Sequence, residues 1–287
     1  MAQDILTIME NNSRGFSKGQ RLIARYITEN YDKAAFMTAG KLGKTVGVSE
    51  STVVRFATEL GYDGYPGMRK AMQEMVRSRL TSVQRIAVAK DMLDGSNVLK
   101  YVMSSDIEKL QSTLEELDRG SFDAAVNAIE DAQHLYIVGM RSSAALASFM
   151  AFYMNFLIEN VRLIHDTTAN EVYEQIMHIG PGDVYIGISY PRYSSSSLKA
   201  MEFAKRRGAT VIALTDNGNS PFARISDINL YAKSDMVSFL DSLIAPMSLI
   251  NALVVATAAR KQETLAQTFN YLEELWSEYE VFTTDKS

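Results

Sequence analysis

The sequence predicts an α/β protein with an all-α N-terminal domain and a C-terminal three-layer domain built on a five-stranded parallel sheet. Two observations carry this prediction. Residues 1–80 contain short segments of helical periodicity and no convincing strand. Past residue 120, short apolar runs alternate with helical stretches, which is typical of a parallel sheet covered on both faces. We expect domains at residues 1–80 and 106–287, joined by a helical linker at residues 81–105.

The composition is that of a soluble globular protein. The chain has 287 residues, of which 47% are hydrophobic and 22% are charged. It contains no cysteine and only three dispersed histidines, so we expect neither a metal nor another cofactor. The first residues lack the features of a signal peptide. Because no apolar stretch reaches the roughly 20 uninterrupted residues of a membrane span, we expect a cytoplasmic protein with no membrane partner.

The net charge of −5 is distributed unevenly along the chain. Residues 1–80 hold 12 Lys and Arg against 8 Asp and Glu, which leaves 17 against 26 for the remainder. A mildly basic first part joined to an acidic second part suggests that only the first part meets a polyanion. An excess of this size also arises by chance, so charge alone does not decide the partner.

Capping residues mark the helices of the first domain. Ser17 and Gln20 have capping-box spacing and predict a helix that continues to about Asn30. A second helix is expected over residues 38–46. Neither segment carries a motif of its own, so their predicted role is to support the helix that follows.

The third helix of this domain has the most informative pattern. Gly47 supplies a tight turn before it, and Ser49 can cap a helix that ends near Leu60. Apolar residues at spacings of three and four predict the inward face, which consists of Val53, Phe56, Ala57 and Leu60. The outward face is then left to Ser51, Thr52, Arg55 and Glu59.

A short helix, a glycine turn and a capped second helix are typical of a helix-turn-helix that binds DNA. The second helix enters the major groove by its N-terminal end, where short side chains permit close approach and an arginine can reach a guanine edge. Any three-helix bundle would show the same inward face, and it is the sparsely charged outward face that favours DNA. The residues predicted to contact DNA are Lys44, Ser49, Ser51, Thr52, Arg55, Tyr62, Tyr65 and Arg69.

The second domain begins with an amphipathic helical stretch and continues with alternating strands and helices. The helical stretch covers about residues 81–118, with a polar break at residues 94–97. The predicted strands are residues 135–138, 161–164, 184–188, 210–214 and 228–232. In sheets of this kind, ligands bind beyond the carboxyl ends of the strands.

Serine-rich loops follow two of these strands. After the first strand, Gly139 allows the chain to turn, and Ser142 and Ser143 open the next helix. The third strand is followed by Ser189 and then by four consecutive serines that begin at Ser194. Hydroxyls and free backbone N–H groups at a helix N-terminus favour an anion. One capping serine per helix would need no ligand, but these loops hold more serines than capping requires.

The phosphate motifs of nucleotide-binding proteins are absent from the sequence. The segment GMRSSA lacks the second and third glycines of GxGxxG, and no Walker A motif occurs. A small phosphorylated ligand is therefore favoured over a nucleotide.

The order of these motifs resembles the RpiR family of bacterial transcriptional regulators, which join a helix-turn-helix domain to a sugar isomerase (SIS) domain. The resemblance covers nearly the whole chain and rests on residues 46–70, 137–144 and 182–230. It implies a homodimer or homotetramer that binds a double-stranded DNA operator. It also implies a SIS domain that senses a phosphorylated sugar or sugar acid and alters operator binding. A dimer would read a palindrome with two recognition helices about 34 Å apart.

SIS domains of this family usually follow the third strand with Ser-x-Ser-Gly-x-Thr. Ser189 matches the first serine and Ser194 the threonine, whereas Pro191 and Arg192 replace the second serine and the glycine. Arg192 then either pairs with a carboxylate or second phosphate of the ligand, or forms a salt bridge with an acidic neighbour. The predicted effector-binding residues are Gly139, Arg141, Ser142, Ser143, Ser189, Arg192, Ser194 and Ser195.

Two other classes of protein compete with this hypothesis. A phosphosugar aldose–ketose isomerase would need a base that moves a proton between adjacent carbons, and the candidates are His165, Asp166, Glu171 and His178. Their spacing fixes no pair of titratable groups, so we predict a protein that is not an enzyme. A pure oligomerisation module would explain the apolar helices near Ala144 and Leu243, but it leaves the serine clusters without a use.

Overall fold

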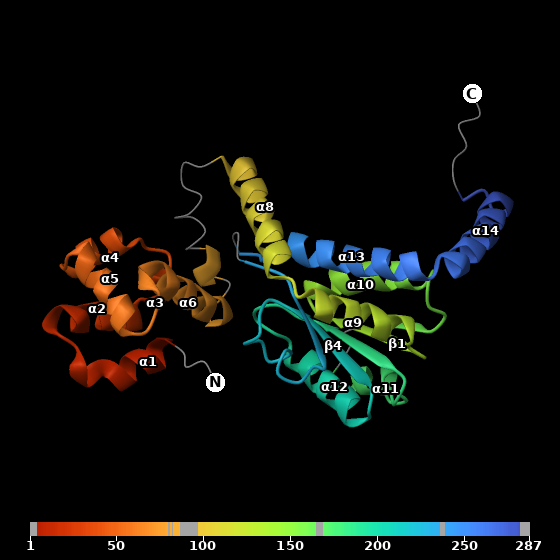
Figure 1. Ribbon diagram of the computed structural model, residues 1–287, viewed down its shortest axis with the longest axis horizontal. Helices are drawn as coiled ribbons and strands as arrows, with labels where there is room; N and C mark the ends of the chain where they lie inside the picture. Colours follow the sequence, from red (N-terminus) through yellow and green to blue (C-terminus); the bar gives the residue numbers. More distant parts are fainter. Residues whose placement is uncertain are drawn as a thin grey trace. The chain divides into compact units, whose positions relative to one another are not determined.

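The protein is described by a computed structural model that covers residues 5–79, 81, 83–86, 97–164, 169–235 and 239–281. It divides into two compact units, residues 1–103 with 235–241 and residues 104–234 with 242–287 (Figure 1). The first unit includes a short segment that the sequence assigns to the second domain. Arg85 explains its place, because this arginine is 1% exposed and pairs with Asp241 at 2.9 Å. The division at residues 80 and 105 stays a prediction.

The described part of the first unit is helical, as the sequence predicts. Its elements are α1 (Ile5–Asn12), η1 (Ser13–Gly15), α2 (Lys18–Glu29), α3 (Tyr31–Ala34), α4 (Ala39–Val46), α5 (Glu50–Glu59) and α6 (Gly64–Arg79). The capping box at the start of α2 is confirmed, because Ser17 accepts from the Gln20 backbone and Gln20 accepts from the Ser17 backbone. The unit has its own core, to which α2, α4, α5 and α6 contribute Ile23, Leu42, Phe56 and Met68, all fully buried.

Helix α8 (Val98–Glu116) begins inside the predicted linker and ends in the predicted second domain. It is followed by α9 (Arg119–Glu130), β1 (Leu135–Gly139), α10 (Ser143–Met154), β2 (Val161–Ile164), α11 (Ala169–Gln175), β3 (Val184–Ile188), α12 (Ser195–Arg206), β4 (Thr210–Thr215), β5 (Ile228–Tyr231), α13 (Ile244–Arg260) and α14 (Gln262–Glu278). All five predicted strands are confirmed, with ends that differ by at most one residue. Among the described residues, no helix is both long enough and apolar enough to cross a membrane.

The strands form one parallel sheet in the order β2-β1-β3-β4-β5. Alternate residues of β1 point to opposite faces, so Leu135 and Ile137 belong to one core and Tyr136 and Val138 to the other. Helices α9, α10 and α13 cover the first face, and α11 and α12 cover the second (Figure 1). The predicted three-layer α/β architecture is therefore confirmed.

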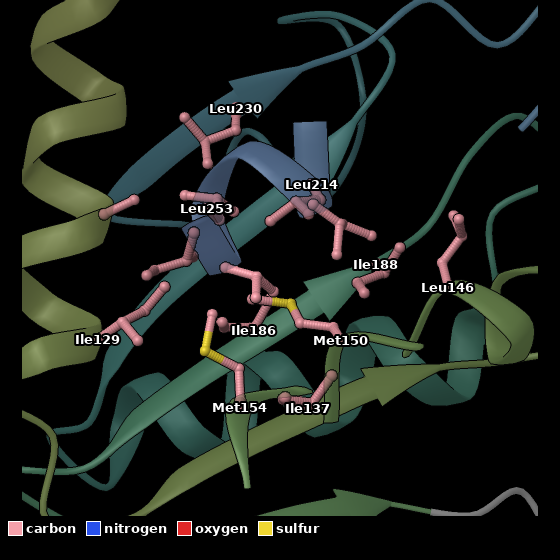
Figure 2. Close-up of a cluster of buried hydrophobic side chains, with 14 of the residues drawn as sticks. Ile129, Ile137, Leu146, Met150, Met154, Ile186, Ile188, Leu214, Leu230 and Leu253 are labelled. Carbon is pink, nitrogen blue, oxygen red and sulfur yellow. The ribbon is translucent and has the colours of Figure 1, made fainter. Parts of the chain in front are cut away.

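Apolar packing against α10 holds the first face together. Figure 2 shows side chains of this core from the strands and from α10, namely Ile137, Ile186, Ile188, Leu214, Leu146, Met150 and Met154. Each is fully buried. Burial of a side chain of this size contributes about 1.5–3 kcal/mol, so α10 is held rigidly on the sheet. Its N-terminus is thereby fixed beside the carboxyl end of β1.

The strand order places the two serine-rich loops next to each other. β1 lies between β2 and β3, and Gly139 at its end pairs in register with Ile188 at the end of β3. The chain leaves β1 toward one side of the sheet and leaves β3 toward the other. Connections that diverge in this way open a crevice at the carboxyl ends of the strands, where ligands bind in open α/β sheets.

Candidate functional site

The turn between α4 and α5 is tight, and two glycines make it possible. Gly47 has φ 77° and ends α4 in the left-handed conformation, which favours glycine. Gly43 lies inside α4, and a Cβ at this position would be 2.8 Å from the Val48 carbonyl oxygen. Gly47 was predictable as a turn residue, whereas the need for Gly43 was not, because its close approach to Val48 is visible only in three dimensions.

Three hydroxyls meet at the N-terminus of α5. Ser49 caps the helix, because its Oγ accepts from the Thr52 backbone N–H at 3.3 Å. The same Oγ lies 2.9 Å from Ser51 Oγ and 2.8 Å from Thr52 Oγ1. Ser49 and Ser51 are exposed, and Arg55 is exposed one turn further along the same helix. The result is a cluster of short polar side chains and one cation at an exposed helix N-terminus.

The predicted inward face of α5 is confirmed. Val53, Phe56 and Ala57 are fully buried, and Leu60 is 7% exposed. On the opposite face, the carboxylate of Glu59 accepts a hydrogen bond from the side-chain amide of Gln20 in α2. This contact fixes α5 against α2 and leaves the N-terminal turn of α5 exposed.

The other predicted DNA contacts fall into different environments. Lys44 is exposed in the last turn of α4, and Tyr62 and Arg69 are half-buried. Tyr65 differs from them, because it is 4% exposed and its hydroxyl donates to the Met37 carbonyl oxygen at 2.9 Å. Burial raises the pKa of Tyr65 to about 12.

Tyr65 therefore has a structural role, which corrects the sequence interpretation. Tyr65, Met68 and Met72 follow helical spacing in α6 and are all turned into the core. The prediction that Tyr65 contacts DNA did not use this spacing, which places its side chain on the buried face of α6. We leave Tyr65 out of the DNA contacts.

At the carboxyl edge of the sheet, Gly139 lets α10 start close to β1. A Cβ on Gly139 would lie 2.4 Å from the Ser143 carbonyl oxygen and 3.0 Å from the Ala147 Cβ. Real Cβ atoms do not approach backbone atoms so closely. Gly139 therefore contributes to this site by its packing, because it brings the first turn of α10 against the strand.

Two arginines in the serine loops adopt left-handed backbone conformations. Arg141 follows β1 with φ 57°, and Arg192 follows β3 with φ 71°. Outside glycine, this conformation costs about 1–2 kcal/mol, and residues held in it cluster at ligand-binding sites. Arg192 stands where the SIS pattern has a glycine, so the backbone keeps a glycine-like conformation although the side chain has changed. Both arginines are exposed.

The serines of the two loops have different local roles. Ser142 precedes α10 in a helical conformation, and its side chain makes no capping hydrogen bond. Ser194 caps α12 by accepting from the Ser197 backbone N–H at 3.3 Å, and its own N–H donates to Ser189 Oγ at 3.3 Å. Ser142 and Ser195 are exposed, whereas Ser143 and Ser189 are each 5% exposed. Capping thus accounts for Ser194 but not for Ser142.

A carboxylate and two tyrosines that were not predicted as site residues lie at the same edge. Asp216 follows β4 directly and is 5% exposed. Its carboxylate accepts from the Tyr193 hydroxyl at 2.7 Å and from the Asn217 amide at 2.7 Å. Tyr190, in the same loop as Tyr193, is 6% exposed. Asp216 stands two residues past the predicted strand at residues 210–214, and a carboxylate at this strand end was the signal that could have identified it.

The candidate bases of the isomerase hypothesis are not brought together by the described structure. His165 and Asp166 lie outside the described residues. Glu171 belongs to the start of α11, which follows the carboxyl end of β2. His178 comes shortly before β3 and therefore lies toward the amino ends of the strands. The fold separates Glu171 from His178.

Comparison with known families divides the chain into two parts. Residues 3–79 match the helix-turn-helix domain of the rpiR family, and residues 128–256 match the SIS domain. An uncharacterised HTH-type transcriptional regulator of Caldanaerobacter subterraneus is 25% identical over 278 residues, which are 94% of this chain and 95% of the relative. The HTH-type transcriptional regulator HexR of Pseudomonas aeruginosa is 26% identical over 267 residues, 90% of each chain.

Solved structures agree with this division. The sugar isomerase domain of an RpiR transcription factor from Sphaerobacter thermophilus is 32% identical, with a TM-score of 0.57 over 60% of this chain and 96% of that domain. The NanR protein of Vibrio vulnificus, solved in complex with ManNAc-6P, is 22% identical. It aligns with a TM-score of 0.60 over 96% of this chain and 98% of NanR, so the two proteins share a fold along their length.

Proposed function

Because this chain belongs to the RpiR family of transcriptional regulators, we propose that its SIS domain binds a phosphorylated sugar or related anionic metabolite that changes operator binding by its helix-turn-helix domain. The observation that carries the proposal is the adjacency of β1 and β3 at the switch point of the sheet. Both strands run into loops that hold serines and begin a helix. The ManNAc-6P complex of NanR supports a phosphosugar as the class of ligand.

The phosphate group has suitable partners in both loops. Backbone N–H groups at the starts of α10 and α12 supply donors and the positive ends of two helix dipoles. Ser142 is the strongest side-chain candidate, because its exposed hydroxyl is not used for capping. Gly139, Ser143, Ser189, Ser194 and Ser195 complete the proposed phosphate environment.

Arg141 and Arg192 are proposed to recognise a second anionic group of the effector. Each guanidinium is carried by a loop next to the phosphate environment, and each loop keeps a strained backbone at the arginine. A guanidinium binds a carboxylate or phosphate through two parallel hydrogen bonds. A sugar acid phosphate therefore fits this pair better than a neutral sugar phosphate.

The proposed DNA-binding surface is the N-terminal end of α5. Ser49, Ser51 and Thr52 supply short donors there, and Arg55 is long enough to reach a base edge. Lys44, Tyr62 and Arg69 are proposed to contact phosphates of the DNA backbone, which position the helix without reading sequence.

A dimer is the proposed oligomeric state. The chain from Leu243 to Ala259, which forms nearly all of α13, contains no charged residue. Two of its apolar side chains are nevertheless exposed, Ile244 to 45% and Val255 to 59%. An uncharged, partly apolar outer face is typical of interfaces between subunits. Light scattering coupled to size exclusion measures the mass directly, and a monomer at operator-binding concentrations would contradict this part of the proposal.

The proposal is tested by measuring ligand binding, operator release and ligand turnover on the same samples. Phosphorylated sugars, sugar acid phosphates and unphosphorylated sugars are screened by thermal shift, and each hit is added to the protein–operator complex. We expect a phosphorylated compound that raises the melting temperature and changes operator affinity without being consumed. A ligand at 100 times its dissociation constant stabilises the native state by about 2.7 kcal/mol.

Ser142→Ala is the matched variant for this assay. Since the Ser142 hydroxyl caps nothing, its removal should leave the stability of the free protein unchanged and abolish most of the ligand shift. Ser148→Ala, an exposed serine further along α10, is the control that should change neither quantity. Turnover of the hit would instead favour an isomerase, and equal ligand shifts in both variants would remove Ser142 from the site.

A further inference from the structure

Tyr190 has the properties of an additional ligand-binding residue. It follows Ser189 at the carboxyl end of β3 and is 6% exposed, with its ring in the core that α10 and α13 share with the sheet. Its hydroxyl has no hydrogen-bond partner among the described residues. A buried hydroxyl without a partner is rare in native proteins, because it loses its hydrogen bonds to water and gains none in return.

Asp216 lies at the same edge of the sheet as the loop that carries Tyr190. Burial is the larger cause of a raised pKa of Tyr190, and the Asp216 carboxylate is the second cause. Asp216 stands at the carboxyl end of β4 and already accepts hydrogen bonds from Tyr193, Thr215 and Asn217. Tyr190 directly follows Ser189, whose backbone N–H donates to the Leu214 carbonyl oxygen in β4 at 3.1 Å, so Tyr190 and Asp216 belong to neighbouring strand ends.

The nearby carboxylate restricts what can satisfy this hydroxyl. A phosphate or carboxylate of the effector would meet the negative charge of Asp216 in a poorly solvated environment, where charges of the same sign repel strongly. A neutral oxygen, such as a sugar hydroxyl or carbonyl, meets no such penalty. It can accept the hydrogen bond that Tyr190 has to donate.

We propose that Tyr190 donates a hydrogen bond to a neutral oxygen of the sugar part of the effector and so contributes to sugar specificity. The inference rests on the proposed function of the SIS domain. It assigns phosphate binding and sugar recognition to different groups of the site. Backbone N–H groups and serines hold the phosphate, while Tyr190 reads the sugar. A site with a buried donor discriminates strongly against an analogue that lacks the matching acceptor.

The variant that tests this inference is Tyr190→Phe, which removes the hydroxyl and keeps the ring. In the free protein the change removes an unpartnered buried polar group, so the melting temperature should rise by about 2–4 °C. The affinity for the phosphosugar hit of the thermal-shift screen should fall about tenfold, which corresponds to about 1.4 kcal/mol. Affinity for inorganic phosphate should not change.

Tyr185→Phe, in β3 itself, is the matched control for Tyr190→Phe in the loop after that strand. Its hydroxyl is fully buried like that of Tyr190, but it donates to the Ser197 carbonyl oxygen at 3.2 Å and lies on the opposite face of the sheet. Its loss should lower the melting temperature and leave both affinities unchanged. The two tyrosines therefore predict opposite changes in stability for the same chemical substitution.

The outcomes separate this inference from the proposed function. If wild type and Tyr190→Phe bind the phosphosugar equally while Ser142→Ala loses it, the role of Tyr190 is refuted and the effector site stands. If wild type binds no phosphorylated sugar, the proposed function fails first. A lower melting temperature of free Tyr190→Phe, or an equal loss of affinity for inorganic phosphate, would also overturn the assignment. The assignment would be supported by a deoxy analogue that wild type binds more weakly than the hit and that Tyr190→Phe binds with the same affinity as the hit.

Discussion

Gly139→Ala should damage the effector site by forcing α10 away from β1. The added Cβ would lie 2.4 Å from the Ser143 carbonyl oxygen, 2.9 Å from the Ser143 carbonyl carbon and 3.0 Å from the Ala147 Cβ. The shortest of these falls about 1 Å below an ordinary van der Waals separation of about 3.5 Å. Two of the three contacts are with backbone, so a change of rotamer cannot relieve them.

The expected cost follows from this geometry. Overpacking of a well-packed core typically costs about 1–3 kcal/mol, and a backbone clash of this depth belongs at the upper end of that range. For a chain of this size the melting temperature should fall by about 2–4 °C for each kcal/mol. Because the N-terminus of α10 must move, Ser142 moves with it. The rise in melting temperature caused by the phosphosugar should therefore be lost as well.

Urea unfolding, with thermal shift in the presence of the phosphosugar hit, measures both effects. Gly180→Ala is the control, since the nearest atom to an added Cβ there is 4.0 Å away and the same substitution should be nearly neutral. The reasoning would be refuted if Gly139→Ala unfolded at the same urea concentration as Gly180→Ala and retained the ligand shift. In that case the position of α10 would not depend on the absence of a Cβ at residue 139.

Three further variants test the proposed DNA contact of Arg55, the structural role of Tyr65 and the proposed ligand contact of Arg192. Arg55→Ala should lose discrimination between operator and unrelated DNA in a binding titration; uniform weakening with a salt slope reduced by about one would instead indicate a phosphate contact. Tyr65→Phe should reduce the free energy of unfolding by about 1 kcal/mol through the lost bond to Met37 and leave operator affinity unchanged. Arg192→Gly removes the guanidinium and the backbone strain together, so stability should change by no more than about 1 kcal/mol. Its affinity for sugar acid phosphates should fall more than its affinity for neutral sugar phosphates, and equal losses would contradict a contact with a second anion.

Features that depend on residues close together in the chain were predictable from the sequence. Ser17, Ser49 and Ser194 are helix caps in the structure, because a cap involves groups only three residues apart. The five strands were recognised for the same reason, since apolar runs bounded by turns are a local signal. The serine loops could be placed at strand ends before their spatial neighbours were known.

What the sequence by itself determined was therefore the five strands, the helices α2, α4 and α5, the architecture of each domain and the class of residues at the strand ends. Only the tertiary structure decided that Tyr65 is buried, that Gly139 must lack a Cβ and that the Tyr190 hydroxyl is left without a partner. The physical reason is that each of these facts depends on contacts between segments that the fold brings together. The sequence does not show whether a given hydroxyl forms its hydrogen bond with solvent, protein or ligand.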